Sequence, residues 1–333
     1  MNWGLIGAST IASQFMIDAI RTLDGHGIRS VLSSDEKRGA GFARRHEIPS
    51  STTDLDELLA DPEIGAVYIS TTNEKHRDQA LAAIAAGKHV LCEKPLAMTV
   101  EDAAGMVEAA REAGVTFATN HHLRNAGSHL KIRELIQTGR IGTVQSIRIF
   151  HAVFLPDFLQ GWRINNAAAG GGVIPDIVVH DADTVRFYLN EDPSQVTAIE
   201  HSTGMGQGVE DSVMSVWTTP SGVMVQTHES FTHAYAGTGI EVHGTSGSIV
   251  GRNVMTQQPV GEVQLTDDSG PQSVSFSDHN LYVRAVTKFA DAMSGNGEPS
   301  ATGIDGIKSL AVSVAVKEAA TTGKTVSVNY GGV

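Results

Sequence analysis

The first 120 or so residues alternate short apolar runs with stretches in which apolar residues recur at helical spacing. Runs of this kind are typical of strands buried on both faces of a sheet, and the helical stretches are typical crossovers. The pattern therefore predicts a parallel sheet with helices on both faces, an α/β domain. The predicted strands are Gly4–Gly7, Ile28–Ser33, Ala66–Ser70, His89–Cys92 and Val115–Thr119. The predicted helices are Ile11–Arg21, Lys37–His46, His76–Ala86 and Val100–Ala113.

A different pattern follows a further predicted helix, Leu130–Thr138. Longer runs now alternate apolar and polar residues, and turn sequences separate them, as in antiparallel sheets. These predicted strands are Thr143–Val153, Ser212–Thr218, Val223–Glu229, Ile240–His243 and Gly261–Thr266. Two amphipathic helices, Leu281–Met293 and Ile304–Ala320, complete the chain, and the second is expected to return to the first domain. Because 333 residues exceed the size of one ordinary core, we predict two domains, 1–120 and 121–333.

Composition narrows the class of protein. The formal net charge of -13 argues against nucleic acid as a partner, because phosphate backbones attract clustered Lys and Arg. No apolar stretch is long enough to span a bilayer, so we expect a cytoplasmic protein without a membrane partner. The single cysteine, Cys92, closes an apolar run and is expected to be a buried strand residue rather than a catalytic thiol. Composition leaves the oligomeric state open between a monomer and a small homo-oligomer.

The turn after the first predicted strand consists of small residues. Gly7, Ala8, Ser9 and Ala12 would let a pyrophosphate approach backbone N–H groups at the start of the following helix. Ser9 stands where the usual glycine fingerprint has its middle glycine, and its hydroxyl could donate to a phosphate oxygen. Small-residue turns also occur in α/β proteins that bind no nucleotide, so the turn alone favours a dinucleotide site without establishing it.

The end of the second predicted strand indicates which dinucleotide would bind. Sites for NAD usually carry an acidic residue there, whereas this strand ends in Ser33-Ser34, with Lys37 and Arg38 close behind. With no carboxylate to repel a 2′-phosphate, the sequence favours NADPH. Asp35 and Glu36 are expected to occupy the start of the next helix, where negative charge is favourable. A solvated helix charge remains the alternative for Arg38.

Glu93-Lys94-Pro95 follows the fourth predicted strand, at the edge of a parallel sheet where ligands gather. A lysine there can donate a hydrogen bond to a carbonyl oxygen and stabilise charge developing on it during hydride transfer. A surface lysine on a loop is the alternative.

A glycine run, Gly170-Gly-Gly172, precedes Asp176 and His180, which would share one helical face. Histidine is suited to proton donation at neutral pH, and the aspartate could bind a substrate hydroxyl or orient the ring. A metal site in which His121 or His122 joins Asp176 and His180 is disfavoured, because it would explain neither Lys94 nor the N-terminal turn. Further polar candidates are His151, Trp162 and Arg163, and Trp162 could equally belong to the core.

These motifs together resemble the glucose-fructose oxidoreductase, inositol dehydrogenase and rhizopine catabolism family over the whole chain. The resemblance implies a dinucleotide-binding Rossmann domain, an α+β substrate-binding domain with a large open, mainly antiparallel sheet, and a substrate cleft between them. It carries the family's catalytic lysine and histidine over to Lys94 and His180, with Asp176 binding substrate. Four strings narrow the resemblance to a reductase subgroup that also has Ser9, namely Asn120–Asn125, Leu159–Arg163, Val179–Thr184 and Gly251–Gln257.

The resemblance implies NADPH-dependent reduction of the C2 ketone of a 1,5-anhydro-sugar. The alternatives are an NAD(P)-dependent polyol or inositol dehydrogenase, an NAD-dependent glycoside hydrolase on the same fold, and a non-catalytic dinucleotide sensor. The candidate catalytic residues are Lys94, His180 and Asp176, and His151 joins these three as candidate substrate-binding residues. The candidate cofactor-binding residues are Gly7, Ser9, Thr10, Ile11, Ala12, Ser33, Ser34, Arg38, Thr71, Asn73, His76, Glu93, Lys94, Asn120, Trp162 and Arg163.

Overall fold

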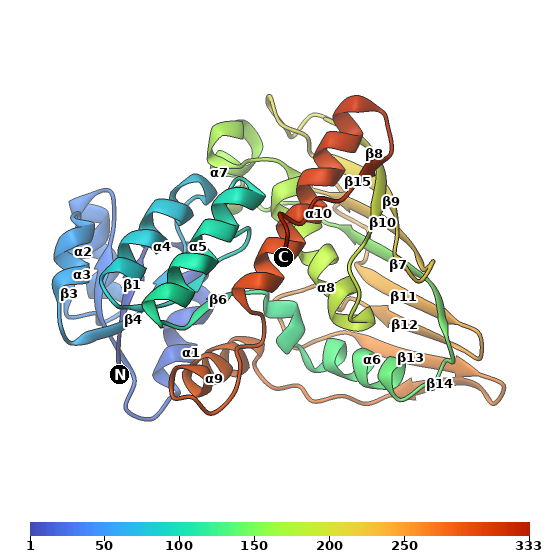
Figure 1. Ribbon diagram of the computed structural model, residues 1–333, viewed down its shortest axis with the longest axis horizontal. Helices are drawn as coiled ribbons and strands as arrows, with labels where there is room; N and C mark the ends of the chain where they lie inside the picture. The colour runs from blue at the N-terminus through green and yellow to red at the C-terminus, as the bar shows by residue number, and fades with distance from the viewer. The chain divides into compact units, whose positions relative to one another are not determined.

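The computed structural model describes residues 1–333 and divides into two compact units (Figure 1). The first unit contains Met1–His121 and Tyr282–Ile307, and the second contains His122–Leu281 and Lys308–Val333. The sequence placed everything after residue 120 in the second domain and expected the last helix to return to the first. In the structure the penultimate helix belongs to the first unit, whereas most of the last helix belongs to the second.

The first unit is built on a six-stranded parallel sheet with strand order β3-β2-β1-β4-β5-β6. This is the doubly wound order of dinucleotide-binding domains, with the strand order reversing beside β1. The strands are β1 Asn2–Ile6, β2 Gly27–Leu32, β3 Ser50–Thr52, β4 Ile64–Ile69, β5 His89–Cys92 and β6 Phe117–Thr119. The helices are α1 Ile17–Arg21, α2 Glu36–Arg45, α3 Leu55–Ala60, α4 His76–Ala85, α5 Val100–Ala113 and α9 Leu281–Met293.

The predicted parallel sheet and its crossover helices are confirmed. β1 and β4 are buried along almost their whole length, because helices cover both faces of the sheet. α5 begins at Thr99, whose side chain accepts a hydrogen bond from the Asp102 N–H, and ends at Gly114 in the left-handed conformation. The predicted helix Ile11–Arg21 is also present, but Ala12–Met16 forms a π turn ahead of α1. The sequence missed β3 and α3, which are too short to show a clear period.

The second unit is built on a nine-stranded sheet with the order β14-β13-β12-β11-β7-β10-β9-β8-β15. Its strands are β7 Val144–Ala152, β8 Gln195–His201, β9 Ser212–Thr218, β10 Met224–Ser230, β11 Gly239–Gly244, β12 Ser248–Arg252, β13 Glu262–Asp267, β14 Gly270–Val274 and β15 Val326–Ser327. All neighbouring pairs are antiparallel except β7 and β10, which run parallel. The predicted large, mainly antiparallel sheet is therefore confirmed.

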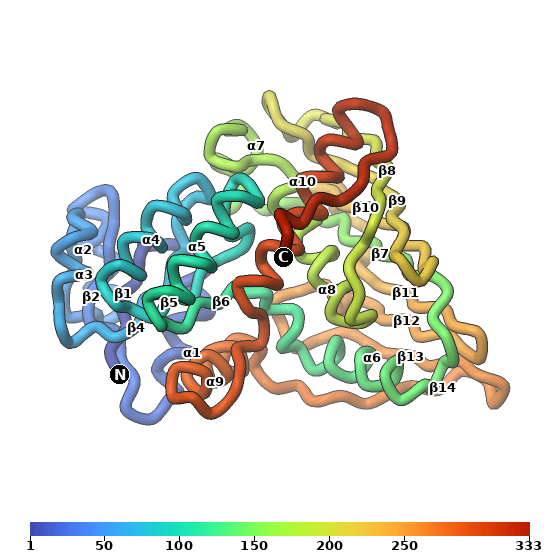
Figure 2. Tube along the Cα trace, in the orientation of Figure 1, coloured from blue at the N-terminus to red at the C-terminus, as the bar shows by residue number.

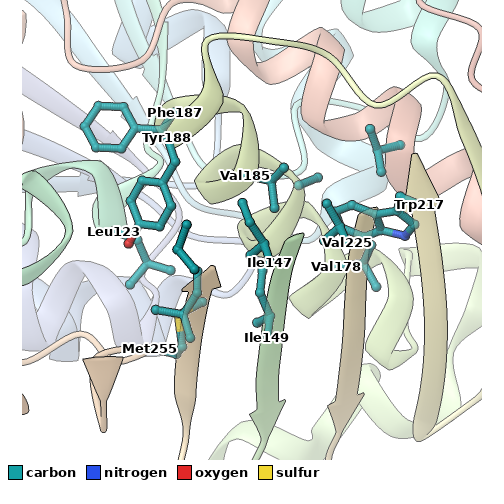
Figure 3. Packing of buried hydrophobic residues seen from close by; sticks show 14 of the residues in the cluster. Leu123, Ile147, Ile149, Val178, Val185, Phe187, Tyr188, Trp217, Val225 and Met255 are labelled. Atoms are coloured by element: carbon teal, nitrogen blue, oxygen red, sulfur yellow. The ribbon is translucent and has the colours of Figure 1, made fainter. Parts of the chain in front are cut away.

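Helices cover one face of this sheet, namely α6 Gly127–Gln137, α8 Val179–Leu189 and the part of α10 (Gly303–Thr322) that belongs to this unit (Figure 1). A further helix of this unit, α7 Asp157–Asn165, has no buried residue. α6 packs against α8, as the chain trace also shows (Figure 2). Ile147 and Ile149 of β7 belong to one buried cluster with Val185 of α8, and Val178 and Trp217 continue this cluster (Figure 3). This alternation on β7 places His151 on the same inward face.

The sequence missed several elements of the second unit, and β8 shows the reason. Val196 and Ala198 of this strand point inward, but the outward-facing Ile199 is 77% exposed and breaks the apolar-polar alternation that identifies a half-buried strand. No helix of the structure combines the length and the apolar character that crossing a membrane requires.

Candidate active site

The turn between β1 and the first helix depends on glycine at position 7. Gly7 has φ +118°, and a Cβ atom there would lie 3.1 Å from the backbone of Ser70. The Ser9 hydroxyl accepts a hydrogen bond from the Ala12 N–H at 3.1 Å and shares another with the Ser70 hydroxyl at 2.7 Å. Ser9 therefore caps the following helix and ties it to the end of β4. The turn presents backbone close to a helix N-terminus, which suits a pyrophosphate.

The structure brings together the predicted residues after β2. Arg38 Nε donates to the Ser33 hydroxyl at 3.1 Å, and its Nη2 donates to the Ser34 hydroxyl at the same distance. Asp35 caps α2, with its carboxylate accepting from the Arg38 N–H at 2.7 Å, and Glu36 begins that helix. The expected use of both acidic residues at the start of the helix is thus confirmed. A guanidinium and two hydroxyl groups remain at the strand end, a set of donors that fits a phosphate.

The residues after β4 form a buried turn. His76 is inaccessible to solvent, and its Nδ1 and Nε2 lie 2.9 Å from the Pro95 carbonyl oxygen and 3.3 Å from the Thr71 carbonyl oxygen. Burial lowers the pKa of His76, which favours the neutral ring. Thr71 donates to Gln79 at 2.6 Å, and Asn73 is buried beside it. The contacts of His76 link the turn after β4 to the turn after β5.

Glu93 joins the ends of three neighbouring strands. Its Oε1 accepts hydrogen bonds from the Tyr68 hydroxyl of β4 at 2.5 Å and from the Asn120 amide after β6 at 2.6 Å. Burial raises the pKa of Glu93, while the two donors and the neighbouring Lys94 oppose that shift. Lys94 follows directly and is half-buried. Sequence reasoning missed Tyr68, because a tyrosine inside an apolar strand carries no local sign of its partner.

Two further observations concern the same strand ends. Asn120 Oδ1 is buried and accepts no hydrogen bond within the protein, so this amide oxygen is an acceptor without a donor. Cys92 is fully buried as the last residue of β5, and burial raises the pKa of its thiol well above the ordinary value. The expectation that Cys92 is a structural strand residue is confirmed.

In the second unit, the glycine run shapes the approach to α8. Gly172 has φ +114°, and a Cβ atom there would collide with the buried Glu210 carboxylate. The Glu210 carboxylate in turn accepts from the Ile174 N–H at 3.1 Å and pairs with Lys317 at 2.8 Å. The segment after the glycines is helical, as expected, but Ile174–Val178 forms a π turn before α8. π turns of this kind often occur at functional sites.

Three of the candidate histidines lie close together in this unit, and Asp176 pairs with Arg163. The His180 ring centre is 6.3 Å from that of His151 and 4.8 Å from that of His122, which meets it edge to face. Asp176 is 9% exposed, and its Oδ2 lies 3.3 Å from Arg163 Nε. The second unit thus holds a group of three imidazole rings and a carboxylate held by a guanidinium.

Trp162 precedes Arg163 in α7 and is half-buried, so it is not a core residue. The Arg163 guanidinium lies 4.7 Å from the centre of the Trp162 ring, a cation-π arrangement in which one face of the indole is covered by the charged group.

The two histidines considered as metal ligands fall in different units, His121 in the first and His122 in the second. No group of three or more His, Cys, Asp or Glu side chains in the chain is arranged to hold a metal ion.

Comparison with known proteins places this architecture in a family. A model described as "Oxidoreductase family, NAD-binding Rossmann fold" matches residues 1–121, and the GFO/IDH/MocA C-terminal domain model matches residues 129–250. The 1,5-anhydro-D-fructose reductase of Ensifer adhaerens is 56% identical over 330 residues, which cover 99% of each chain. The chain therefore belongs to the GFO/IDH/MocA oxidoreductase family, as the resemblance indicated, and its first unit is an NAD(P)-binding Rossmann domain.

Solved structures agree on the fold. An aldose-aldose oxidoreductase from Caulobacter crescentus, complexed with glycerol, has a TM-score of 0.90 at 24% identity, covering 98% of this chain and 99% of that one. A levoglucosan dehydrogenase complexed with NADH and L-sorbose has a TM-score of 0.88 at 24% identity, covering 99% of both chains. At these identities the likeness concerns architecture.

Proposed function

We propose that this protein is an NADPH-dependent reductase that converts the C2 ketone of 1,5-anhydro-D-fructose into the alcohol of 1,5-anhydro-D-mannitol. The observation that carries the proposal is the 56% identity to a 1,5-anhydro-D-fructose reductase, which extends over 99% of both chains. The match runs through both units, so it spans the residues after β5 and those around α8. We expect the protein to act in the cytoplasm, as a monomer or small homo-oligomer, on a free sugar.

The residues of the first unit fit a nicotinamide dinucleotide. The Gly7 turn leaves room for a pyrophosphate where a side chain would touch Ser70, and the Asn120 Oδ1 atom is a buried acceptor suited to an amide N–H. Arg38, Ser33 and Ser34 provide donors where NAD-specific domains carry a carboxylate, which supports NADPH. Thr71 and Asn73 line the neighbouring turn.

Each polar residue then has a chemical role. When bound, NADPH supplies the hydride that reduces C2 of the substrate. Lys94 donates a hydrogen bond to the ketone oxygen and stabilises the negative charge that develops on it. His180 gives a proton to that oxygen. Asp176, oriented by Arg163, accepts hydrogen bonds from substrate hydroxyl groups.

Steady-state oxidation of NADPH, followed by its absorbance, tests the proposal against 1,5-anhydro-D-fructose and a panel of 2-keto sugars and other anhydro-sugars. We expect 1,5-anhydro-D-fructose to give the highest kcat/KM, and 1,5-anhydro-D-mannitol to be the product identified by NMR. NADH, tested in parallel, should be the poorer cofactor.

The same assay separates the alternatives. Oxidation of inositol with NAD at a higher kcat/KM than ketone reduction would identify a polyol dehydrogenase. Cleavage of a glycoside with no net consumption of cofactor would identify an NAD-dependent glycoside hydrolase. Dinucleotide binding without turnover of any sugar would identify a sensor, and each of these results would reject the reductase.

A further inference from the structure

A buried acidic cluster lies beside the candidate histidines of the second unit. Asp181 of α8 and Glu229 of β10 are both inaccessible to solvent. Glu229 is the register partner of His151 on the parallel strands β10 and β7, and both side chains face inward. His151 Nδ1 lies 2.7 Å from Asp181 Oδ1. A helix and two strands therefore bring two carboxyl groups and one imidazole together.

The two carboxyl groups share a hydrogen bond, which requires a proton on one of them. Burial raises the pKa of each well above the ordinary value, and the nearby His151 partly opposes that rise at Glu229. Asp181 Oδ2 and Glu229 Oε1 accept from no N–H or other O–H group, so these are the oxygen atoms available for the shared proton. Two ionised carboxylates in this position would place two negative charges side by side away from solvent, whereas a carboxylate and a carboxylic acid carry one charge and share a hydrogen bond.

A chain of hydroxyl groups leads to Glu229 and occupies one of its two oxygen atoms. The Trp217 indole can only donate, and it donates to the Ser215 hydroxyl at 2.8 Å. The buried Ser215 hydroxyl then donates a hydrogen bond to the Thr227 hydroxyl at 2.7 Å, and the Thr227 hydroxyl donates to Glu229 Oε2 at 3.1 Å. Thr227 thus occupies Oε2, and the hydrogen bond shared with Asp181 is left to Oε1.

Asp181 is the ionised member, because its Oδ1 lies 2.7 Å from His151 Nδ1, whereas Glu229 accepts only from a hydroxyl group at 3.1 Å. The shared proton therefore lies on Glu229, and Asp181 Oδ1 accepts from the Nδ1–H of His151. With Nδ1 carrying a fixed hydrogen, proton exchange of the His151 ring takes place at Nε2. Other titratable groups nearby are His180, whose ring centre is 6.3 Å away, and His129, on which His151 acts to lower the pKa. The neighbouring Asp183 is already paired with Arg124 at 2.8 Å.

We infer that Asp181 and protonated Glu229 form a positioning pair that fixes the ring and tautomer of His151, so that His151 assists His180 in supplying the proton for ketone reduction. The inference rests on the proposed function for its catalytic part. The tautomer and the shared proton are properties of the resting protein. Asp181 and Glu229 act through His151 and touch no substrate.

Two amide substitutions separate the members of the pair. In Glu229→Gln, the amide oxygen still accepts from Thr227 and the amide nitrogen still donates to Asp181, so we expect the wild-type tautomer and a kcat within about twofold of wild type. In Asp181→Asn, the new amide must accept the Glu229 proton with its oxygen and turn its NH2 group toward His151. His151 then takes the opposite tautomer, and kcat should fall on the order of tenfold or more with an unchanged KM for NADPH.

Spectroscopy measures the pair without substrate. Nitrogen-15 NMR of histidine-labelled protein, with His151→Gln assigning the signal, should show hydrogen on Nδ1 in wild type and in Glu229→Gln, and on Nε2 in Asp181→Asn. Infrared spectra of wild type should contain a protonated-carboxyl C=O band that Glu229→Gln lacks. If Asp181→Asn fails to fold, the infrared spectra of wild type and Glu229→Gln still decide whether Glu229 is protonated.

Tyr188→Phe is the matched control, because Tyr188 is also fully buried on α8 and bonds to another histidine, His129, at 2.7 Å. It should lower stability and leave the His151 signals unchanged. The inference is overturned if the infrared band is absent from wild type, if Asp181→Asn keeps the wild-type tautomer, or if Glu229→Gln loses as much kcat as Asp181→Asn. A wild-type protein that reduces no sugar would reject the proposed function, while the two spectra would still test the pair.

Discussion

In the first unit the candidate cofactor residues lie at the carboxyl ends of adjacent parallel strands, whereas in the second unit the candidate substrate residues come from helices and one strand of a mixed sheet. A parallel sheet collects at one edge whatever follows each strand, so Ser33 and Lys94 each need only a local motif. In the second unit, His151 meets Asp181 only through the packing of α8 on β7. Changes in the two regions should therefore have different kinds of effect.

The largest expected effect is loss of a long-range ion pair of the second unit. Arg124 contacts both carboxylate oxygens of Asp183, and the Asp183 side chain is 1% exposed. Removing one partner leaves a buried charge, so Asp183→Asn should lower the free energy of unfolding by about 3–5 kcal/mol. Urea unfolding measures this loss. Glu241→Gln, which breaks the exposed pair with Arg148, should cost less than about 1 kcal/mol, and equal losses would contradict the argument.

The next effect is on catalysis and compares one residue from each unit. Lys94→Ala and His180→Ala should each reduce kcat/KM for the ketone by about 10²- to 10³-fold, because each removes a proposed donor to the ketone oxygen. If both act on that oxygen atom as proposed, the double variant should lose less than the product of the two single losses. The exposed Lys324 provides the control as Lys324→Ala. Near-wild-type turnover of either folded variant would remove that residue from the mechanism.

A third effect concerns a buried histidine of the second unit. Burial lowers the pKa of His129 from 6.5 to about 4. Between pH 6.5 and 4 the unfolded chain is therefore protonated at His129 while the folded protein is not. The contribution of neutral His129 to the free energy of unfolding is fully present above pH 6.5 and is lost as pH falls toward 4. The loss over this window should reach about 3 kcal/mol. Urea unfolding of wild type and His129→Gln at several pH values should show the steeper decline in wild type, and parallel curves would contradict it.

The smallest expected effect is on the preference of the first unit for NADPH over NADH. Ser33→Asp places a carboxylate beside Arg38, where the 2′-phosphate is proposed to bind, so kcat/KM with NADPH relative to NADH should fall about tenfold, equivalent to about 1.4 kcal/mol. Ser50→Asp adds the same charge to an exposed position on β3 and should leave the ratio unchanged. An unaltered ratio in Ser33→Asp would remove Ser33 from the proposed phosphate site.

The sequence predicted most of the first unit because its information is local. Buried strands appear as apolar runs, and the caps of α5 at Thr99 and Gly114 stand where the periodicity ends. The Gly7 turn and the Ser33-Ser34 strand end were likewise visible as short motifs. β8 escaped prediction because an outward Ile199 masks its alternation.

Tertiary structure alone decided the partners of the buried polar groups. Asp176 and His180 could be paired from their spacing, but nothing local indicates that Tyr68 donates to Glu93 or that Glu229 stands beside His151. Strand register and helix packing, which join residues far apart in the chain, determine these contacts. The sequence by itself therefore determined the fold class and the candidate cofactor and proton-transfer residues. The structure decided which neighbours set their protonation, because burial makes each unpaired charge costly.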